Sequence, residues 1–211
     1  MNKSVIFLIL IAVGFAAWIV SFIFSKVFSK GGGLKNYKSL AEKYSLNIDE
    51  FHKEGKIKLP LLTGSYRDFP VSLGAMLKPD SVKKTPVTFI AAECENKDNF
   101  SFVIARRSKE NKIKYGSAES PIGDKEFDEK FIVNTNNSGE MSTIMNFNIK
   151  YKLIQAQHLG AYGDLILNGN KVLYTEDGYI SSDTALMKAE IILHLVCDIA
   201  DEMKRIKPVI G

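Results

Sequence analysis

The sequence predicts an α+β protein, with an N-terminal transmembrane helix followed by an antiparallel β-meander packed against C-terminal helices. Three observations predict this class. An uncharged apolar run occupies residues 5–24, strand-like segments follow one another between residues 57 and 134, and a long amphipathic segment lies near the end of the chain. Runs of strands followed by helices are typical of α+β domains, whereas regular strand–helix alternation would predict a parallel sheet.

The apolar run from Val5 to Phe24 contains no charged side chain. At 1.5 Å per residue, a helix of this length reaches about 30 Å, the thickness of the hydrocarbon core of a bilayer. We therefore expect residues 1–25 to form a single transmembrane helix, with the bilayer as partner of residues 5–24. The alternative is a cleaved signal peptide with its cut near Ala17. The apolar core of a signal peptide, about 7–15 residues, is shorter than this run.

Residues 26–36 form a basic, Gly-rich linker, and residues 37–211 form the expected soluble α+β domain. The linker includes the triplet Gly31–Gly33. Only Lys3 precedes the apolar run, whereas several lysines follow it closely: Lys26, Lys30, Lys35 and Lys38. By the positive-inside rule this asymmetry places the domain in the cytoplasm.

The excess of basic over acidic residues lies beside the predicted span. The chain has 28 basic and 24 acidic residues, and residues 1–35 contain four lysines and no acid, so residues 36–211 hold 28 − 4 = 24 basic against 24 acidic side chains. A neutral domain has no excess charge for a phosphate backbone, so no nucleic-acid partner is expected. Cys94 and Cys197 are too far apart in sequence for a metal-binding Cys pair, and they predict free buried thiols.

Strand patterns with turn residues between them predict the sheet. Residues 57–77 are expected to form two strands around Gly64–Asp68, and the other expected strands are 87–95, 100–107, 127–134, 164–167 and 171–175. We expect 87–95 and 100–107 to pair as a hairpin. The Asn168-Gly169 turn predicts a second hairpin between 164–167 and 171–175.

Helical spacing of apolar residues predicts three helices. The first covers residues 37–46, with 48–52 as a further turn, and the second covers 140–159 with a break near Asn146, a good capping residue. The apolar face of the second helix is expected to contain Ile144, Phe147, Tyr151 and Ile154. The third runs from Ser182 or Asp183 to about Ile206.

The last helix carries a row of polar residues at a spacing of four: Glu190, His194 and Asp198. Such a row can hold a metal ion. It is also what the solvent face of an amphipathic helix looks like, and we expect this second interpretation to hold. No metal or cofactor is therefore predicted.

The segment Gly123-Asp124-x-x-Phe127-Asp128-x-x-Phe131 could bring two carboxylates together. Paired carboxylates can divide acid and base roles or bind a cation. The structural alternative is that Gly123 and Asp124 form a turn, while Phe127 and Phe131 share the core face of a strand. We expect the structural alternative, and no catalytic residue is assigned.

Gly64-x-Tyr66-Arg67 and the Gly-Asp-x-x-Phe-Asp segment lie about sixty residues apart. In these two motifs, residues 57–135 resemble uncharacterised bacterial proteins that have an N-terminal membrane helix and a small α+β domain. The resemblance implies a protein of the bacterial inner (cell) membrane and no known activity. The candidate residues are Tyr66, Arg67, Asp124 and Asp128, and we expect Arg67 to pair with one of the two acids.

The leading hypothesis is a single-pass membrane protein whose cytoplasmic domain is a non-catalytic module that binds a protein partner or the membrane surface. The alternative is a membrane-tethered hydrolase that uses Asp124 and Asp128. A raised carboxyl pKa in a deep pocket would favour that alternative. A third hypothesis, an envelope sensor outside the cytoplasm, is disfavoured by the free thiols and by the absence of a lipobox cysteine near the span.

Overall fold

The computed structural model describes residues 33–54, 57–78, 85–96 and 99–206. The predicted transmembrane helix, at residues 1–25, and most of the linker lie outside these residues. Among the residues that are described, no helix combines the length and the apolar character that crossing a membrane requires. The first described helix, α2 (Gly33–Tyr44), begins inside the predicted linker.

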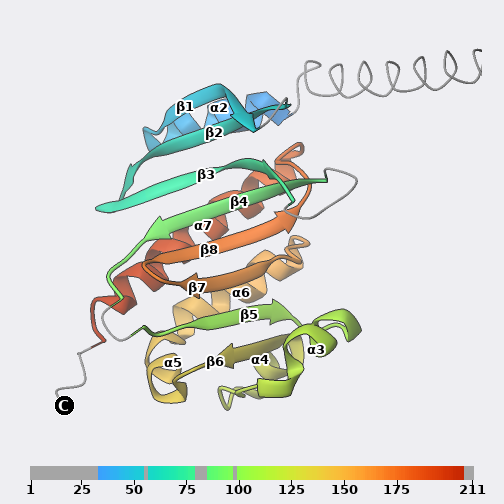
Figure 1. Ribbon diagram of the computed structural model, residues 1–211, viewed down its shortest axis with the longest axis vertical. Helices are drawn as coiled ribbons and strands as arrows, with labels where there is room; N and C mark the ends of the chain where they lie inside the picture. The colour runs from blue at the N-terminus through green and yellow to red at the C-terminus, as the bar shows by residue number, and fades with distance from the viewer. Residues whose placement is uncertain (1–32, 55–56, 79–84, 97–98, 207–211) are drawn as a thin grey trace, which may run out of the picture.

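The described chain is built on one eight-stranded antiparallel sheet with the order β1-β2-β3-β4-β8-β7-β5-β6 (Figure 1). The strands are β1 (Asn47–Glu54), β2 (Ile57–Tyr66), β3 (Phe69–Leu77), β4 (Pro86–Glu93), β5 (Phe102–Arg106), β6 (Phe131–Thr135), β7 (Asp164–Asn168) and β8 (Lys171–Asp177). The α+β class and the antiparallel sheet are confirmed, as are the β2–β3 and β7–β8 hairpins.

The predicted hairpin between β4 and β5 is wrong, because the β7–β8 hairpin lies between these two strands. The segment that connects β4 to β5 crosses the end of this hairpin and is bonded to its turn. The amide of Cys94 donates to the carbonyl of Asn170 at 2.9 Å, and the side chain of Asn96 donates to the carbonyl of Gly169 at 2.7 Å. Local turn residues do not reveal such an insertion from a distant part of the chain.

Three longer helices, α2, α6 (Phe147–His158) and α7 (Asp183–Met203), cover the same face of the sheet in Figure 1. The shorter helices are α3 (Lys109–Tyr115), the 3₁₀ turn η1 (Gly116–Ala118), α4 (Lys125–Lys130) and α5 (Ser138–Ile144). The predicted break near Asn146 is confirmed, since its side chain accepts a hydrogen bond from the amide of Ile149 and caps α6. Ser182 caps α7 in the same way.

Two predicted elements are wrong. Residues 48–52 belong to strand β1 rather than to a helical turn. Residues 127–130 belong to helix α4 rather than to a strand, because the carboxylate of Asp124 accepts a hydrogen bond from the amide of Phe127 and starts the helix. A spacing of four puts Phe127 and Phe131 on one face of either element, so their pattern could not decide between them.

The core lies between the sheet and its helices, and Phe127 and Phe131 both belong to it. Their rings stack with centroids 4.6 Å apart. Cys94 and Cys197 are free and buried, as predicted. Burial raises the pKa of Cys94 to about 11 and that of Cys197 to about 12, so both thiols stay protonated and unreactive at neutral pH.

Candidate functional site

The polar row on α7 does not face solvent, so that prediction is wrong. Asp198 is only 8% exposed, and His194 and Glu190 are partly covered. They face three neighbours: α2, the β2–β3 turn and α6. A helical wheel separates polar from apolar residues, but it does not show that other elements pack against the flanks of the helix.

Asp198 is the centre of a charged cluster. One carboxylate oxygen accepts a hydrogen bond from Arg67 at 2.5 Å, and the other accepts from Asn148 at 2.8 Å and from Lys152. Burial alone would raise the pKa of Asp198, but the hydrogen bonds and charges of Lys152 and Arg67 outweigh it and lower the pKa. The carboxylate therefore stays ionised and joins the β2–β3 turn to α6 and α7.

The β2–β3 turn presents Arg67 to this cluster through an unusual backbone. Arg67 has φ 53° and Asp68 has φ 66°, and these two residues connect the paired Tyr66 and Phe69. A two-residue turn with both φ values positive suits the twist of a hairpin, and Gly, Asn and Asp are the residues that adopt it readily. Asp68 is one of these residues and Arg67 is not, so the backbone strain lies at Arg67. Such strain is often found at functional positions.

His194 lies between two tyrosines from different elements. Its ring nitrogens are 3.2 Å from the hydroxyl of Tyr44, at the end of α2, and 3.0 Å from the hydroxyl of Tyr66, at the end of β2. Burial, followed by the charge of Lys152, lowers the pKa of His194. The neutral imidazole can donate to one hydroxyl and accept from the other, so it links α2, β2 and α7 without a net charge.

The predicted pairing of Arg67 with Asp124 or Asp128 is also wrong. Asp124 instead accepts from Lys150 at 2.5 Å, and this hydrogen bond, with that of the Phe127 amide, lowers its pKa. Asp128 accepts from the backbone amides that precede α4, at 3.0 and 3.1 Å. Tyr66 and Arg67 thus belong to one cluster, whereas the two acids have other partners in and around α4.

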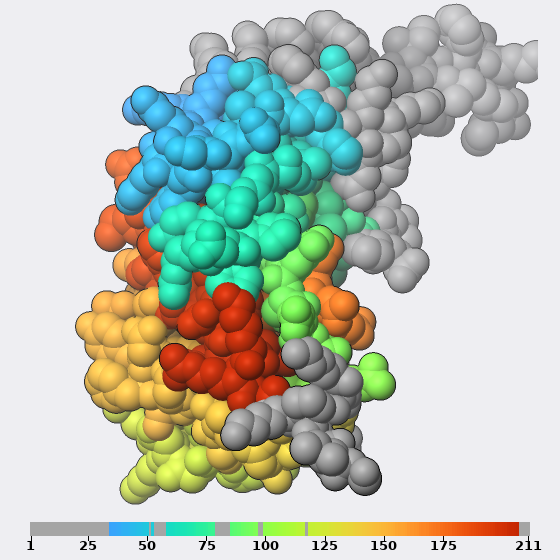
Figure 2. Space-filling model, turned by 90° about the vertical axis from the view of Figure 1, so that its left-hand side faces the viewer, coloured from blue at the N-terminus to red at the C-terminus, as the bar shows by residue number. Residues whose placement is uncertain are grey.

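Two aromatic side chains stand exposed beside the Asp198 cluster. Phe147 is 79% exposed and Tyr151 is 50% exposed, and their rings stack at 6.0 Å with an interplanar angle of 15°. They are the sequence neighbours of Asn148 and Lys152, which bind Asp198. We call the group of Arg67, Phe147, Asn148, Tyr151 and Lys152 the α6 surface. Figure 2 shows the side of the molecule on which the β2–β3 hairpin, helix α6 and the last turns of α7 lie together.

The exposure of this pair corrects half of the predicted face of the second helix, whereas Ile144 is buried and Ile154 packs against the core as predicted. Helix α6 has two apolar stripes, and the sequence interpretation selected the one that contains Phe147 and Tyr151. The structure buries the other stripe: Ile149, Leu153 and Ala156. Both stripes have helical spacing, so the sequence offered no signal for choosing between them. Asn148 and Lys152 were missed because their partner, Asp198, lies in a distant part of the chain.

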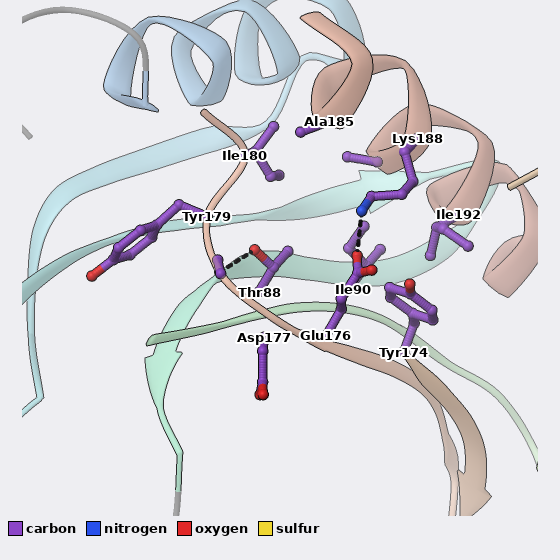
Figure 3. Close-up of a pocket in the computed structure, with 12 residues that line it drawn as sticks. Thr88, Ile90, Tyr174, Glu176, Asp177, Tyr179, Ile180, Ala185, Lys188 and Ile192 are labelled. Carbon is purple, nitrogen blue, oxygen red and sulfur yellow. Dashed lines mark hydrogen bonds and ion pairs between the residues drawn. The ribbon is translucent and has the colours of Figure 1, made fainter. Parts of the chain in front are cut away.

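A second candidate is the small cavity between α7 and the β4–β8 part of the sheet (Figure 3). Its volume is about 30 Å³, which suits one water molecule. Lys188 of α7 pairs with Glu176 at 2.5 Å, and the hydroxyl of Thr88 donates to the carbonyl of Gly178 at 2.8 Å. These groups satisfy one another, so we interpret the cavity as structural. Within the described ranges, no group of three or more His, Cys, Asp or Glu side chains could hold a metal ion.

Comparison with known proteins bears on the fold alone. No protein-family model matches the chain. No curated protein matches it either. Among solved structures, the chain resembles the mycobacterial trehalose monomycolate transport factor A, TtfA, with a TM-score of 0.53 and 14% sequence identity. The similarity covers 84% of this chain and 97% of that chain. At this identity it supports a shared architecture.

Proposed function

We propose that the chain is a single-pass membrane protein whose domain is a non-catalytic module that binds a protein partner through the α6 surface. The observation that carries the proposal is the stacked pair of Phe147 and Tyr151, exposed to solvent beside an arginine and a lysine. Exposing two aromatic rings is unfavourable unless another surface covers them. Aromatic residues and arginine are also the types that contribute most to binding energy at interfaces.

The α6 surface is ordered before any partner arrives. Asp198 holds Arg67 from the β2–β3 turn and Lys152 from α6 in fixed positions. Stacking on Tyr151 limits the rotamers of Phe147. A partner would therefore lose little of its binding energy to ordering these side chains.

The hydrolase alternative has less support. A general acid needs a raised pKa, whereas the pKa of Asp124 is lowered by Lys150 and by the amide of Phe127. Asp128 uses its carboxylate to hold the turn that precedes α4. Both acids thus have structural roles that explain their positions.

The structural neighbour is a trehalose monomycolate transport factor, so a fold of this kind can serve in transport. The apolar run at residues 5–24 supports anchoring in a bacterial inner membrane, and the lysines that follow it support a cytoplasmic domain. The protein partner would then be a cytoplasmic protein, or a cytoplasmic segment of a membrane protein.

Replacing the aromatic pair tests the proposed binding. We expect one specific protein to co-purify with the wild type from membranes, and its amount to fall at least about tenfold with the Phe147→Ser/Tyr151→Ser variant. The reason is that interface hot spots typically contribute about 2 kcal/mol or more to binding. The measurement is quantitative mass spectrometry after mild crosslinking. Met187→Ser is the matched control, since Met187 is an exposed apolar residue of α7 outside this surface. Equal recovery from all three proteins would contradict the proposal.

A further inference from the structure

The end of the domain opposite the β2–β3 turn has its own exposed apolar residue. Ile113, on α3, is 88% exposed. The same short helix carries three lysines and one acid in the sequence Lys-Glu-Asn-Lys-Ile-Lys-Tyr. A single exposed apolar side chain is common on protein surfaces, but an isoleucine among lysines also has the composition of segments that lie on anionic membranes.

Helix α3 is held rigidly, so this exposure is not the result of a loose helix. The hydroxyl of Ser108 caps its first turn by accepting from the amide of Asn111. At its other end, Lys114 and the hydroxyl of Tyr115 both donate to Asp164 at the start of β7, at 2.9 and 2.6 Å. These contacts hold α3 in an orientation in which the side chain of Ile113 is exposed to solvent.

A second exposed side chain, an aromatic one, lies at the same end of the strands. Tyr162, in the loop between α6 and β7, is exposed, and the guanidinium of Arg106 lies 4.3 Å from its ring centre. Arg106 is the last residue of β5, and α3 begins three residues later at Lys109. Tyrosine and arginine together suit the headgroup region, where an aromatic ring meets both apolar and charged groups.

The chain also enters the domain at this end. Helix α2 begins at Gly33, and Asn36 in its first turn is buried and donates to the carbonyls of Ile180 and Ser182 at 3.2 and 3.1 Å. These bonds fix the start of α2 to the loop that precedes α7. In Figure 1 the start of α2 and α3 lie at the same end of the strands.

Only residues 25–32 separate Gly33 from the predicted span. Eight residues reach at most about 28 Å when fully extended. The bilayer must therefore lie within about that distance of the start of α2. Six strand spacings, about 29 Å, separate β1 from β5, so a bilayer lying flat against this end would meet both α2 and α3.

We propose that the α3 end, defined as the start of α2 with Lys35, helix α3, and Tyr162, docks on an anionic lipid surface. This rests on the transmembrane span of the proposed function. Ile113 and Tyr162 enter the headgroup region, while exposed lysines, Lys35, Lys109 and Lys112, attract anionic lipid. Phe147 lies at the far end of α6, about 17 Å along the helix axis from His158, so docking leaves the α6 surface clear of the headgroups.

The test uses the full-length protein in vesicles of phosphatidylglycerol and phosphatidylcholine that contain a nitroxide-labelled quencher lipid. A fluorescent thiol label is placed at Ile113→Cys or, as control, at Asp201→Cys on the last turn of α7 at the other end of the domain. The native thiols are buried, so the unsubstituted protein gives the background. We expect severalfold stronger quenching at position 113 than at position 201.

Charge reversal provides the second arm of the test. Lys109→Glu/Lys112→Glu should reduce the ratio of docked to undocked protein by at least about fivefold for each lysine lost, and vesicles of phosphatidylcholine alone should reduce it as well. Equal quenching at positions 113 and 201, or quenching at 113 that is insensitive to these charges, overturns the docking proposal. Loss of the protein from the vesicles in an alkaline carbonate wash is a different failure, because it removes the transmembrane span itself.

Discussion

Phe127→Ala should destabilise the domain by about 3–5 kcal/mol, the typical loss when a buried phenylalanine is truncated. The Phe127 side chain is fully buried and stacks on Phe131. Asp124→Ala removes a helix cap and a surface ion pair, and should cost only about 1 kcal/mol. Urea unfolding of the two variants and the wild type measures both values.

A different ranking would change the interpretation of this segment. If Phe127→Ala keeps wild-type stability while Asp124→Ala and Asp128→Ala gain stability, the core assignment is wrong. Acids that are retained at a cost in stability are characteristic of functional sites. The hydrolase hypothesis would then be better supported than the hypothesis of a binding module.

Asp198→Ala should destabilise the domain by about 2–3 kcal/mol, because it leaves Arg67 and Lys152 without the carboxylate that neutralises them. The loss stays below that of a fully buried pair, since the Arg67 side chain is 40% exposed and partly solvated by water. Asp201→Ala is the control on the same helix. Its contact with Lys204 is on the surface, and its loss should be below about 0.5 kcal/mol.

The pH dependence of the stability of the wild type and of Asp198→Asn tests whether the charge of Asp198 causes this loss. The pKa of Asp198 is lowered in the folded state, so its ion pairs contribute stability above the unfolded-state pKa of about 3.9, and this contribution is lost as pH falls through the lower folded-state pKa. The stability difference between the wild type and Asp198→Asn should therefore be largest near neutral pH and shrink in acid. A difference that is constant with pH would show that the charge of Asp198 does not matter.

Local signals in the sequence predicted most of the elements and two of the hairpins, but not the order of the strands in the sheet. The turn at Asn168-Gly169 depends on adjacent residues and was predicted correctly, and the start of α7 was predicted at Ser182 or Asp183, of which Ser182 is the cap. The place of the β7–β8 hairpin between β4 and β5 depends on contacts between segments more than 70 residues apart, such as that of Asn96 with Gly169. Local sequence patterns do not predict contacts between segments that are so far apart in the chain.

The candidate site was predicted only in part, for the same reason. The motif pointed to Tyr66 and Arg67, and the strained turn with its ion pair to Asp198 explains their positions. The wrong partners were assigned because the α7 row was interpreted as a solvent face. Phe147 and Tyr151 were assigned to the core because α6 has two apolar stripes of equal spacing, and only tertiary packing determines which one is buried.

Photocrosslinking from position 147 in intact cells tests the central claim most directly. A photoreactive phenylalanine analogue in place of Phe147 should give one discrete adduct with another protein, and Tyr151→Ser should reduce that adduct. The same analogue at position 187, also exposed, should not give it. If positions 147 and 187 give the same diffuse products, or if Tyr151→Ser leaves the adduct unchanged, the α6 surface is not where this protein binds a partner.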